Sequence, residues 1–249
     1  MKRAPFIVCL ALVFQVATFH ATAQEPDEDG FVSLFDGKTL DGWTVPKGDN
    51  GHWKVVDGVI DYDANSESPD RDKNLWSEKE YGDFILKIDW RIKQHAGKYP
   101  MPIILPDGTH LQGPDGKDIT IKLPNADSGV YLRGVDKAQV NIWCWPIGSG
   151  EVYGYRMDKS MPPEVRAGVT PKINADNPVG EWNTFIIIVV GDRLSVVLNN
   201  KQIITNAQLP GLPSKGKISL QHHGGFRNGQ YSPGSSLVQF RNISIKELD

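Results

Sequence analysis

Residues 139–145 alternate amides and indoles with smaller apolar side chains, and this pattern indicates chemistry most directly. Successive side chains of an extended strand point to opposite faces. One face therefore carries two amides followed by two indoles, and the other carries small apolar groups: Gln139, Asn141, Trp143 and Trp145 against Val140, Ile142 and Cys144. Amides pair with sugar hydroxyls, and indoles cover the apolar C–H faces of a sugar ring. The pattern favours a carbohydrate-binding wall; two tryptophans that cap a minor core beneath a loop are the alternative.

Two neighbouring segments supply further polar and aromatic groups. In residues 128–134 the alternation places Tyr131 and Arg133 together, on the side opposite the aliphatic residues that face the core. The fixed donors of an arginine suit hydroxyls or a carbonyl oxygen. A later loop adds an acid, two tyrosines and an arginine: Glu151, Tyr153, Tyr155 and Arg156. For this loop a salt-bridged surface segment is the alternative.

Two adjacent histidines stand at the end of the strand expected at residues 217–223. Neighbouring residues of a strand face opposite ways, so His222 and His223 cannot bind one ion unless the backbone bulges. Gln221 and His223 share a face, and His222 is expected to be an inner, hydrogen-bonded histidine. We prefer His223 for proton transfer or ligation, because neutral imidazole can do either near neutral pH. The sequence shows no zinc-site spacing and no required cofactor, and a divalent metal stays open.

Several common catalytic patterns are missing from the sequence. Retaining glycosidases place two carboxylates about 5 Å apart, yet no expected strand carries alternating acids. Asp89 stands alone in its strand, and Glu78 and Glu80 precede that strand. There is also no Gly-x-Ser-x-Gly elbow and no phosphate-binding loop. An enzyme of this sequence would use a route other than two-carboxylate hydrolysis.

The elements that must position these groups are strands, because period-two alternation dominates the sequence. Residues 83–93 alternate most clearly, and the continuous apolar run 185–190 indicates a strand covered on both faces. Hairpin turns are expected at Asp57-Gly58 and at Asn199-Asn200, and a bulge near Arg241-Asn242 would reconcile a change of apolar parity. About ten strands with scarcely any helix predict an all-β, jelly-roll-like sandwich of two packed antiparallel sheets.

Two long segments, residues 94–125 and 146–181, interrupt the strands and are rich in glycine and proline. Long loops in a compact domain are uncommon and are often functional. We expect them to wall a site, and each could hold a small hairpin, for example at residues 119–123. Surface decoration is the alternative.

Residues 1–23 have the layout of a secretory signal peptide: a positive start, an apolar run and a small-x-small end. The run is shorter than the roughly 20 residues that span a bilayer. Export to the periplasm or the exterior is therefore expected, leaving residues 24–249 as one domain. A net charge of -3 gives no case for nucleic acid, and no other segment suits a membrane span. Cys144, the cysteine that remains, is expected to pack as a small apolar residue.

Several segments, taken in order, resemble the 3-keto-disaccharide hydrolase family. They are Phe35-Asp36-Gly37 with Gly42-Trp43, Val56-Asp57-Gly58-Val59, Tyr81-Gly82-Asp83-Phe84, Asp127-Ser128-Gly129-Val130-Tyr131-Leu132-Arg133-Gly134, Gly180-Glu181-Trp182-Asn183, Leu220-Gln221 with His223-Gly224, and Phe240-Arg241-Asn242-Ile243. The likeness runs from about Phe31 to Leu248. It implies a concanavalin-A-like sandwich that acts on glycosides oxidised to a ketone at sugar carbon 3.

Such a ketone implies a particular route of cleavage. It acidifies the hydrogen on carbon 2, so that a base can remove it and the enolate can expel the group on carbon 1; water then adds to the enone. This route needs a base and an oxyanion stabiliser rather than a carboxylate pair. The candidate catalytic residues are His223, Glu151 and Arg133. The candidate substrate-binding residues are Gln139, Asn141, Trp143, Tyr131, Tyr153, Arg156, Gln221 and Asp127.

Two positions depart from the family pattern. Asp127 stands where many relatives have Asn, and Gln139-Val140-Asn141 stands where many show Glu-x-Gln. A non-catalytic, lectin-like glycan-binding module is the alternative function, and it agrees with the lack of paired acids.

Overall fold

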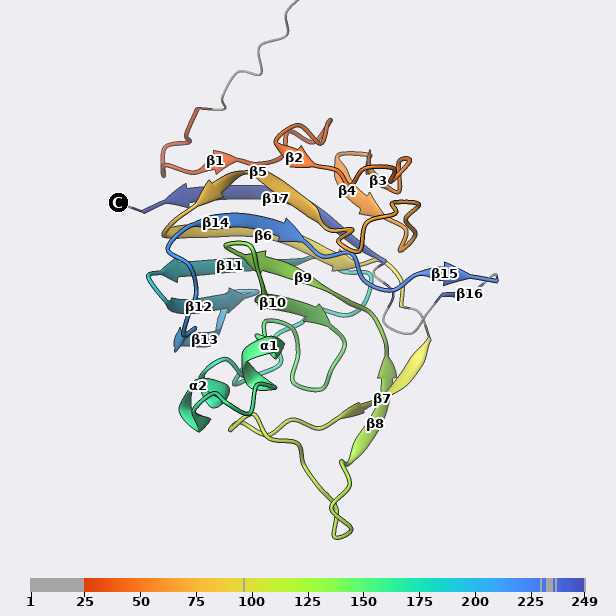
Figure 1. Cartoon of the computed structure of the whole chain (residues 1–249), viewed down its shortest axis with the longest axis vertical. Coiled ribbons are helices and arrows are strands. Elements are labelled where there is room, and N and C mark those ends of the chain that lie inside the picture. The colour runs from red at the N-terminus through yellow and green to blue at the C-terminus, as the bar shows by residue number, and fades with distance from the viewer. Residues whose placement is uncertain (1–24, 96, 229, 232–234, 236, 249) are drawn as a thin grey trace, which may run out of the picture.

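The computed structural model of the chain describes residues 25–95, 97–228, 230–231, 235 and 237–248. The expected signal peptide lies outside the described residues. The strands form two antiparallel sheets that pack against each other, with two small hairpins beside them (Figure 1). The predicted all-β sandwich is confirmed.

The larger sheet has eight strands; seven follow the order β13-β12-β11-β6-β17-β4-β3, and β1 pairs with β17. Its strands are β13(Lys201–Gln208), β12(Arg193–Leu198), β11(Asn183–Val190), β6(Phe84–Ile92), β17(Val238–Glu247), β4(Val59–Tyr62), β3(Trp53–Val56) and β1(Val32–Ser33). Both hairpin predictions are confirmed. The β3–β4 turn places Asp57 and Gly58 at positive φ, and the β12–β13 turn does the same with Asn199 and Asn200.

The smaller sheet has the order β10-β9-β14-β5-β2. Its strands are β10(Val135–Trp143), β9(Asp127–Leu132), β14(Gly216–Leu220), β5(Leu75–Tyr81) and β2(Trp43–Thr44). Because β9 and β10 follow each other along the chain, one end of this sheet is their tight turn. The other end brings Asp127 beside Trp143.

The core lies between the two sheets and follows the alternation of the sequence. Every second residue of β6, from Phe84 to Ile92, is buried, as predicted. In β11 the burial also alternates, and Val190 is exposed. The expectation that this run is covered on both faces is therefore wrong, and its β-branched residues reflect strand preference rather than double burial.

The predicted bulge in the last strand is confirmed. The pairing of β17 with β6 loses register between Arg241 and Ser244, and Asn242 there has a φ of 49°. The side-chain amide of Asn242 donates to Asp89 at 2.7 Å. The bulge thus lets Phe240 and Ile243 both reach the core despite their different parity.

The two long segments fold differently from each other. Residues 94–125 carry the hairpin of β7(Lys98–Pro102) and β8(Thr120–Pro124), which projects beyond the sandwich in Figure 1. Residues 146–181 carry two short helices, α1(Tyr153–Arg156) and α2(Pro163–Gly168), in place of the hairpin that the sequence allowed. A further small hairpin joins β15(Phe226–Arg227) to β16(Gln230–Tyr231). Among the described residues, no helix is both long and apolar enough to cross a membrane.

Candidate active site on the smaller sheet

Polar residues from three adjacent strands share one face of the smaller sheet. In the β9–β10 ladder Gln139 pairs with Tyr131 and Asn141 pairs with Gly129, and Ser219 of β14 pairs with Tyr131 from the other side. Gln221 follows β14, and its backbone N–H donates to the carbonyl of Gly129. We call Tyr131, Gln139, Asn141, Ser219 and Gln221 the polar face. The parity argument for its members is confirmed, because their neighbours Val130, Val140 and Ile142 are in the core.

Four side-chain atoms of the polar face are buried without a hydrogen-bond partner among the described residues. They are Nε2 of Gln139, Oδ1 of Asn141, Oγ of Ser219 and Oε1 of Gln221. A buried polar group left unpaired costs about 1–3 kcal/mol, so four on one face carry a substantial cost in the absence of a ligand or water. Donors and acceptors gathered in this way are what a polyhydroxylated ligand would satisfy.

A hydrogen bond within the polar face and a glycine beside it fix its geometry. Gln221 donates through Nε2 to the hydroxyl of Tyr131 at 3.0 Å, and burial raises the pKa of Tyr131 to about 12, so its phenol keeps its proton. Gly129 has no side chain, and a Cβ placed there would lie 2.5 Å from Nε2 of Gln139. Glycine therefore allows Gln139 to lie across β9.

Asp127 and His223 lie together at one end of the polar face. Oδ2 of Asp127 is 3.8 Å from Nε2 of His223, and their side chains are 29% and 39% exposed. Burial raises the pKa of Asp127 to about 6, and the neighbouring imidazole of His223 acts in the opposite direction on that pKa. A carboxylate and an imidazole that are partly open to solvent and coupled in this way can exchange a proton with a bound molecule.

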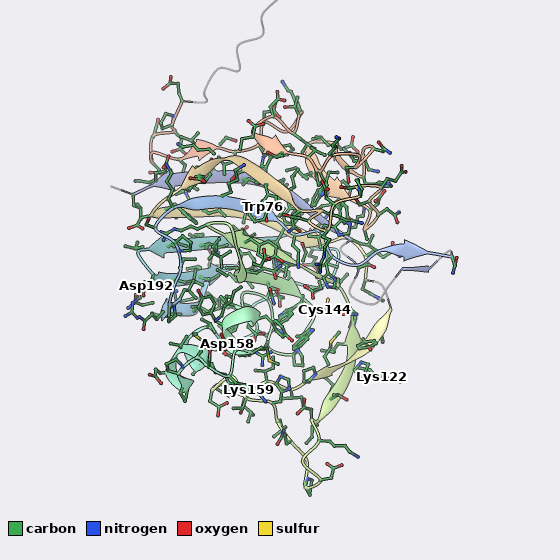
Figure 2. All side chains as sticks on the ribbon, viewed as in Figure 1. Trp76, Lys122, Cys144, Asp158, Lys159 and Asp192 are labelled. Atoms are coloured by element: carbon green, nitrogen blue, oxygen red, sulfur yellow. The ribbon has the colours of Figure 1, made fainter. Side chains whose placement is uncertain are left out.

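Aromatic rings flank the polar face on both sides. Trp143 and Trp145 stack with ring centres 4.2 Å apart, and Tyr153 packs edge-on against both. Trp143 also donates through Nε1 to the carbonyl of Gly148, so the loop caps this indole as the alternative interpretation held. On the other side Trp76 of β5 stacks on Tyr131 at 6.1 Å (labelled in Figure 2).

Trp76 was not among the residues that the sequence singled out. In the structure Leu75 and Ser77 are buried on either side of it and Trp76 is half-buried between them. The segment around Trp76 resembles an ordinary amphipathic strand, so the sequence did not mark Trp76 as a site residue. Its partner Tyr131 is 55 residues away along the chain.

The structure does not bring Arg133 to the polar face. Arg133 follows the last residue of β9 at a φ of 50°, at the end of the strand away from Asp127. Its buried guanidinium donates to the carbonyls of Gly82, Gly191 and Pro213, and it pairs with Asp83 at 2.8 Å. The expectation that Arg133 shares a face with Tyr131 is wrong, because the turn breaks the alternation, and this side chain instead ties three turns together.

Glu151 and Arg156 are occupied with each other, although the backbone of Glu151 lies beside Asn141 of the polar face. The two side chains form an ion pair with each other, and both are fully buried. Arg156 additionally donates to the carbonyl of Gly108 and to Nε2 of His110, and burial lowers its pKa to about 10. The predicted cluster exists, but it is an interior salt bridge that joins α1 to the β7–β8 segment. Of this cluster, Tyr153 contacts the tryptophans.

The expectation that no strand carries alternating acids is wrong, because Glu78 and Glu80 both belong to β5. The register between β5 and β14 shifts between Lys217 and Ser219, so the strand is irregular where these acids lie. Both side chains are exposed, in contrast to the buried polar face. They therefore form no counterpart of the enclosed carboxylate pair of a retaining glycosidase.

His222 and Cys144 are held in their neutral forms. Burial lowers the pKa of His222 to about 4, and its ring packs on Tyr62 at 4.6 Å. Burial also raises the pKa of the Cys144 thiol to about 11, which agrees with the predicted apolar packing. Within the part of the chain that the structure describes, no three His, Cys, Asp or Glu side chains gather as a metal site would require.

An antiparallel sandwich with a buried polar face between aromatic rings, four of whose side-chain atoms have no partner among the described residues, is typical of a carbohydrate-active β-sandwich protein. The family model for the 3-keto-alpha-glucoside-1,2-lyase-like domain matches residues 30–246, and the chain belongs to this family. The resemblance seen in the sequence is thus confirmed.

Known proteins agree with this assignment. A 3-keto-disaccharide hydrolase of Bacteroides thetaiotaomicron is 30% identical over 247 residues, which cover 90% of this chain and 80% of that protein. Two solved structures from Parabacteroides distasonis, described as glycosyl hydrolases, share the fold. One has a TM-score of 0.53 and 20% identity, with 88% of this chain and 84% of the other covered. The second has a TM-score of 0.51 and 21% identity, with 89% and 95% covered.

Proposed function

We propose that the protein cleaves glycosides that carry a ketone at carbon 3 of the sugar, by elimination followed by addition of water. Family membership and the name of the Bacteroides relative support this substrate class. The observation that carries the proposal is the polar face, whose four unpaired buried atoms lie beside the partly exposed Asp127–His223 pair.

In the proposed reaction His223 removes the proton from carbon 2, and the electron pair forms an enolate with the 3-keto group. Collapse of the enolate breaks the bond between carbon 1 and the leaving oxygen, which takes up a proton. Water then adds to carbon 1 of the enone, and a proton returns to carbon 2. The amide of Gln139 is a donor for the developing oxyanion, and Asn141 and Gln221 are acceptors for sugar hydroxyls. Asp127 orients the imidazole and balances its charge.

A reaction in heavy water with a 3-keto-glucoside tests this route. We expect release of the leaving group together with deuterium at carbon 2 of the sugar product. His223→Asn keeps the size of the side chain but loses the base, so the rate should fall about 10²- to 10⁴-fold. His52→Asn is the matched control, because His52 also pairs with a carboxylate, Asp63, at 3.0 Å, on the segments that flank β3 and β4.

Each result bears on a different part of the proposal. Release without deuterium at carbon 2 would show direct hydrolysis and overturn the elimination. Equal rates for the wild type and His223→Asn would remove His223 from the mechanism. Saturable binding of an unmodified glycan by calorimetry, with no cleavage of any 3-keto-glucoside, would establish the non-catalytic glycan-binding module instead.

The pH dependence of kcat/KM gives an independent check. Because the pKa of Asp127 is raised to about 6 and is coupled to His223, the rate should fall as the pH drops through about 6 and the pair takes up a proton. Asp127→Asn leaves one titrating group, so the acid limb should move and the maximal rate should fall. An unchanged profile in Asp127→Asn would contradict the role of the pair.

We further infer that the protein is exported and begins at Gln24 after cleavage, which the layout of residues 1–23 supports. Sequencing the amino terminus of protein recovered from the periplasm or the medium tests this. Recovery of an intact Met1 terminus from the cell interior alone would overturn it.

A further inference from the structure

A cavity of about 490 Å³ opens at the end of the sandwich where β6 and β10 finish. Its walls come from the two sheets, from the β7–β8 hairpin and from the loop before β11. Cys144, labelled in Figure 2, lines the cavity together with Ile121, Leu123 and Pro124 of β8. Neither the sugar chemistry proposed above nor the predicted site residues use this space, apart from Trp143 and Trp145.

The walls of the cavity are mainly aromatic and aliphatic. Three indoles line it, those of Trp90, Trp143 and Trp145. Ile121 and Val179, each 40% exposed, also line it and leave apolar surface open to solvent. A flat, largely apolar ligand would bury this surface, whereas a sugar would find few partners here.

The polar groups of the cavity are nearly all engaged within the protein. The side-chain amides of Asn174, Asn177 and Asn183 donate to backbone carbonyls. Two buried atoms of lining residues have no partner among the described residues, and they are of opposite kinds: the donor Nε1 of Trp90 and the acceptor Oδ1 of Asp176. The second carboxylate oxygen of Asp176 accepts from the backbone N–H of Ser149 at 2.8 Å, which fixes this side chain.

The cavity adjoins the proposed catalytic end of the polar face. Trp143 lines the cavity and is the register partner of Asp127, which pairs with His223. The neighbouring Cys144 lies within electrostatic reach of both Asp176 and Asp127. The cavity and the Asp127–His223 pair are therefore neighbours on either side of Trp143.

We propose that this cavity binds the leaving group of the substrate, and that this group is an aryl ring bearing a phenolic hydroxyl. The inference rests on the proposed function. The hydroxyl donates to Oδ1 of Asp176 and accepts from Nε1 of Trp90, and the ring lies among the indoles. The cavity thereby assigns a substrate class, phenolic aryl glycosides, to the site.

Binding of 7-hydroxycoumarin to the mature protein tests the cavity without any turnover. We expect saturable binding by calorimetry. Trp145→Ala should weaken it about tenfold, the effect of losing one aromatic contact. Asp176→Asn should weaken 7-hydroxycoumarin more than unsubstituted coumarin, because only the former has the hydroxyl. Tyr99→Ala is the control, since Tyr99 is a 49% exposed aromatic outside the cavity lining.

The outcomes separate this inference from the proposed function. No saturable binding by wild type, or equal affinity in Trp145→Ala with its fold verified by thermal unfolding, overturns the cavity assignment. With turnover, Trp145→Ala should raise KM for an aryl 3-keto-glucoside more than for a 3-keto-disaccharide. Cleavage of both with equal changes in KM leaves the reaction standing and overturns the aryl site. Saturable binding of 7-hydroxycoumarin without cleavage of either substrate supports the aryl site and overturns the proposed reaction.

Discussion

Buried polar side chains in this protein serve two opposite purposes, which burial alone does not distinguish. The guanidinium of Arg133 is matched by three carbonyls and a carboxylate. The amide nitrogen of Gln139 is also buried, and it has no hydrogen-bond partner among the described residues. A matched group of this kind holds the fold together, whereas an unmatched one lowers stability and is expected where a ligand binds.

Substituting methionine at each position should separate these purposes. Arg133→Met removes the donor of three carbonyls and the cationic partner of Asp83, which keeps only the backbone N–H of Gly191. We expect a loss of about 3–5 kcal/mol in the free energy of unfolding. Gln139→Met removes an unpaired group at similar size, so stability should stay within about 1 kcal/mol of wild type or rise, while turnover of the 3-keto-glucoside falls. Urea unfolding and initial rates measure both. A large loss of stability in Gln139→Met would mean that its amide has a structural partner.

At the scale of single residues, strand parity predicted more than half of the candidate site. It placed Gln139, Asn141, Tyr131 and Gln221 correctly because each lies inside or directly after a regular strand. It failed for Arg133 because parity ends where a residue enters a turn. The alternation of residue types does not show at which residue a strand ends, and an error of one residue reverses the predicted face.

Among the elements, α1 depends on a glycine for its place against β10. A Cβ on Gly154 would lie 2.5 Å from the carbonyl oxygen of Lys137, which is backbone and cannot move aside easily. Tyr153, the preceding residue, packs on the paired tryptophans. The position of the helix is therefore coupled to the aromatic wall of the site.

Gly154→Ala should force α1 away from β10 and cost about 1–3 kcal/mol, as overpacking does. Gly168→Ala is the matched control, because its methyl would meet Ala207 at an ordinary 3.6 Å. Thermal unfolding compares the two, and tryptophan fluorescence should change in Gly154→Ala alone. Equal stability and equal fluorescence spectra for both variants would show that α1 can accommodate the added methyl group, contrary to the close approach of Gly154 to Lys137.

Sequence periodicity predicted the strands but not the content of the long segments. Residues 146–181 contain two helices of four and six residues, which are too short to show a helical repeat. The acids of β5 were missed for a related reason, since the bulged strand has no regular alternation around Glu78 and Glu80. A contact between distant segments, such as the stacking of Trp76 on Tyr131, has no local signature in the sequence.

For the molecule as a whole, Asp176 makes stability depend on pH. Burial raises its pKa to about 6 from the usual value of 3.8, so the folded state holds the proton more tightly than the unfolded chain. The stability that this group contributes is therefore full below about pH 4 and is lost as the pH rises through 6. Asp176→Asn should exceed wild type by about 1–3 kcal/mol at pH 7 and match it near pH 4. A constant difference across this range in urea unfolding would contradict the burial of the charge.

The unmatched atoms of the polar face also determine which sugars the protein can refuse. A deoxy sugar would fill the same space and displace water from an amide or hydroxyl of the polar face, but it would form no hydrogen bond with that group. Sites built to hydrogen-bond a hydroxyl discriminate against such analogues far more strongly than apolar pockets discriminate by size. The protein would then discriminate against sugars that lack a single hydroxyl more strongly than against sugars that differ in ring size.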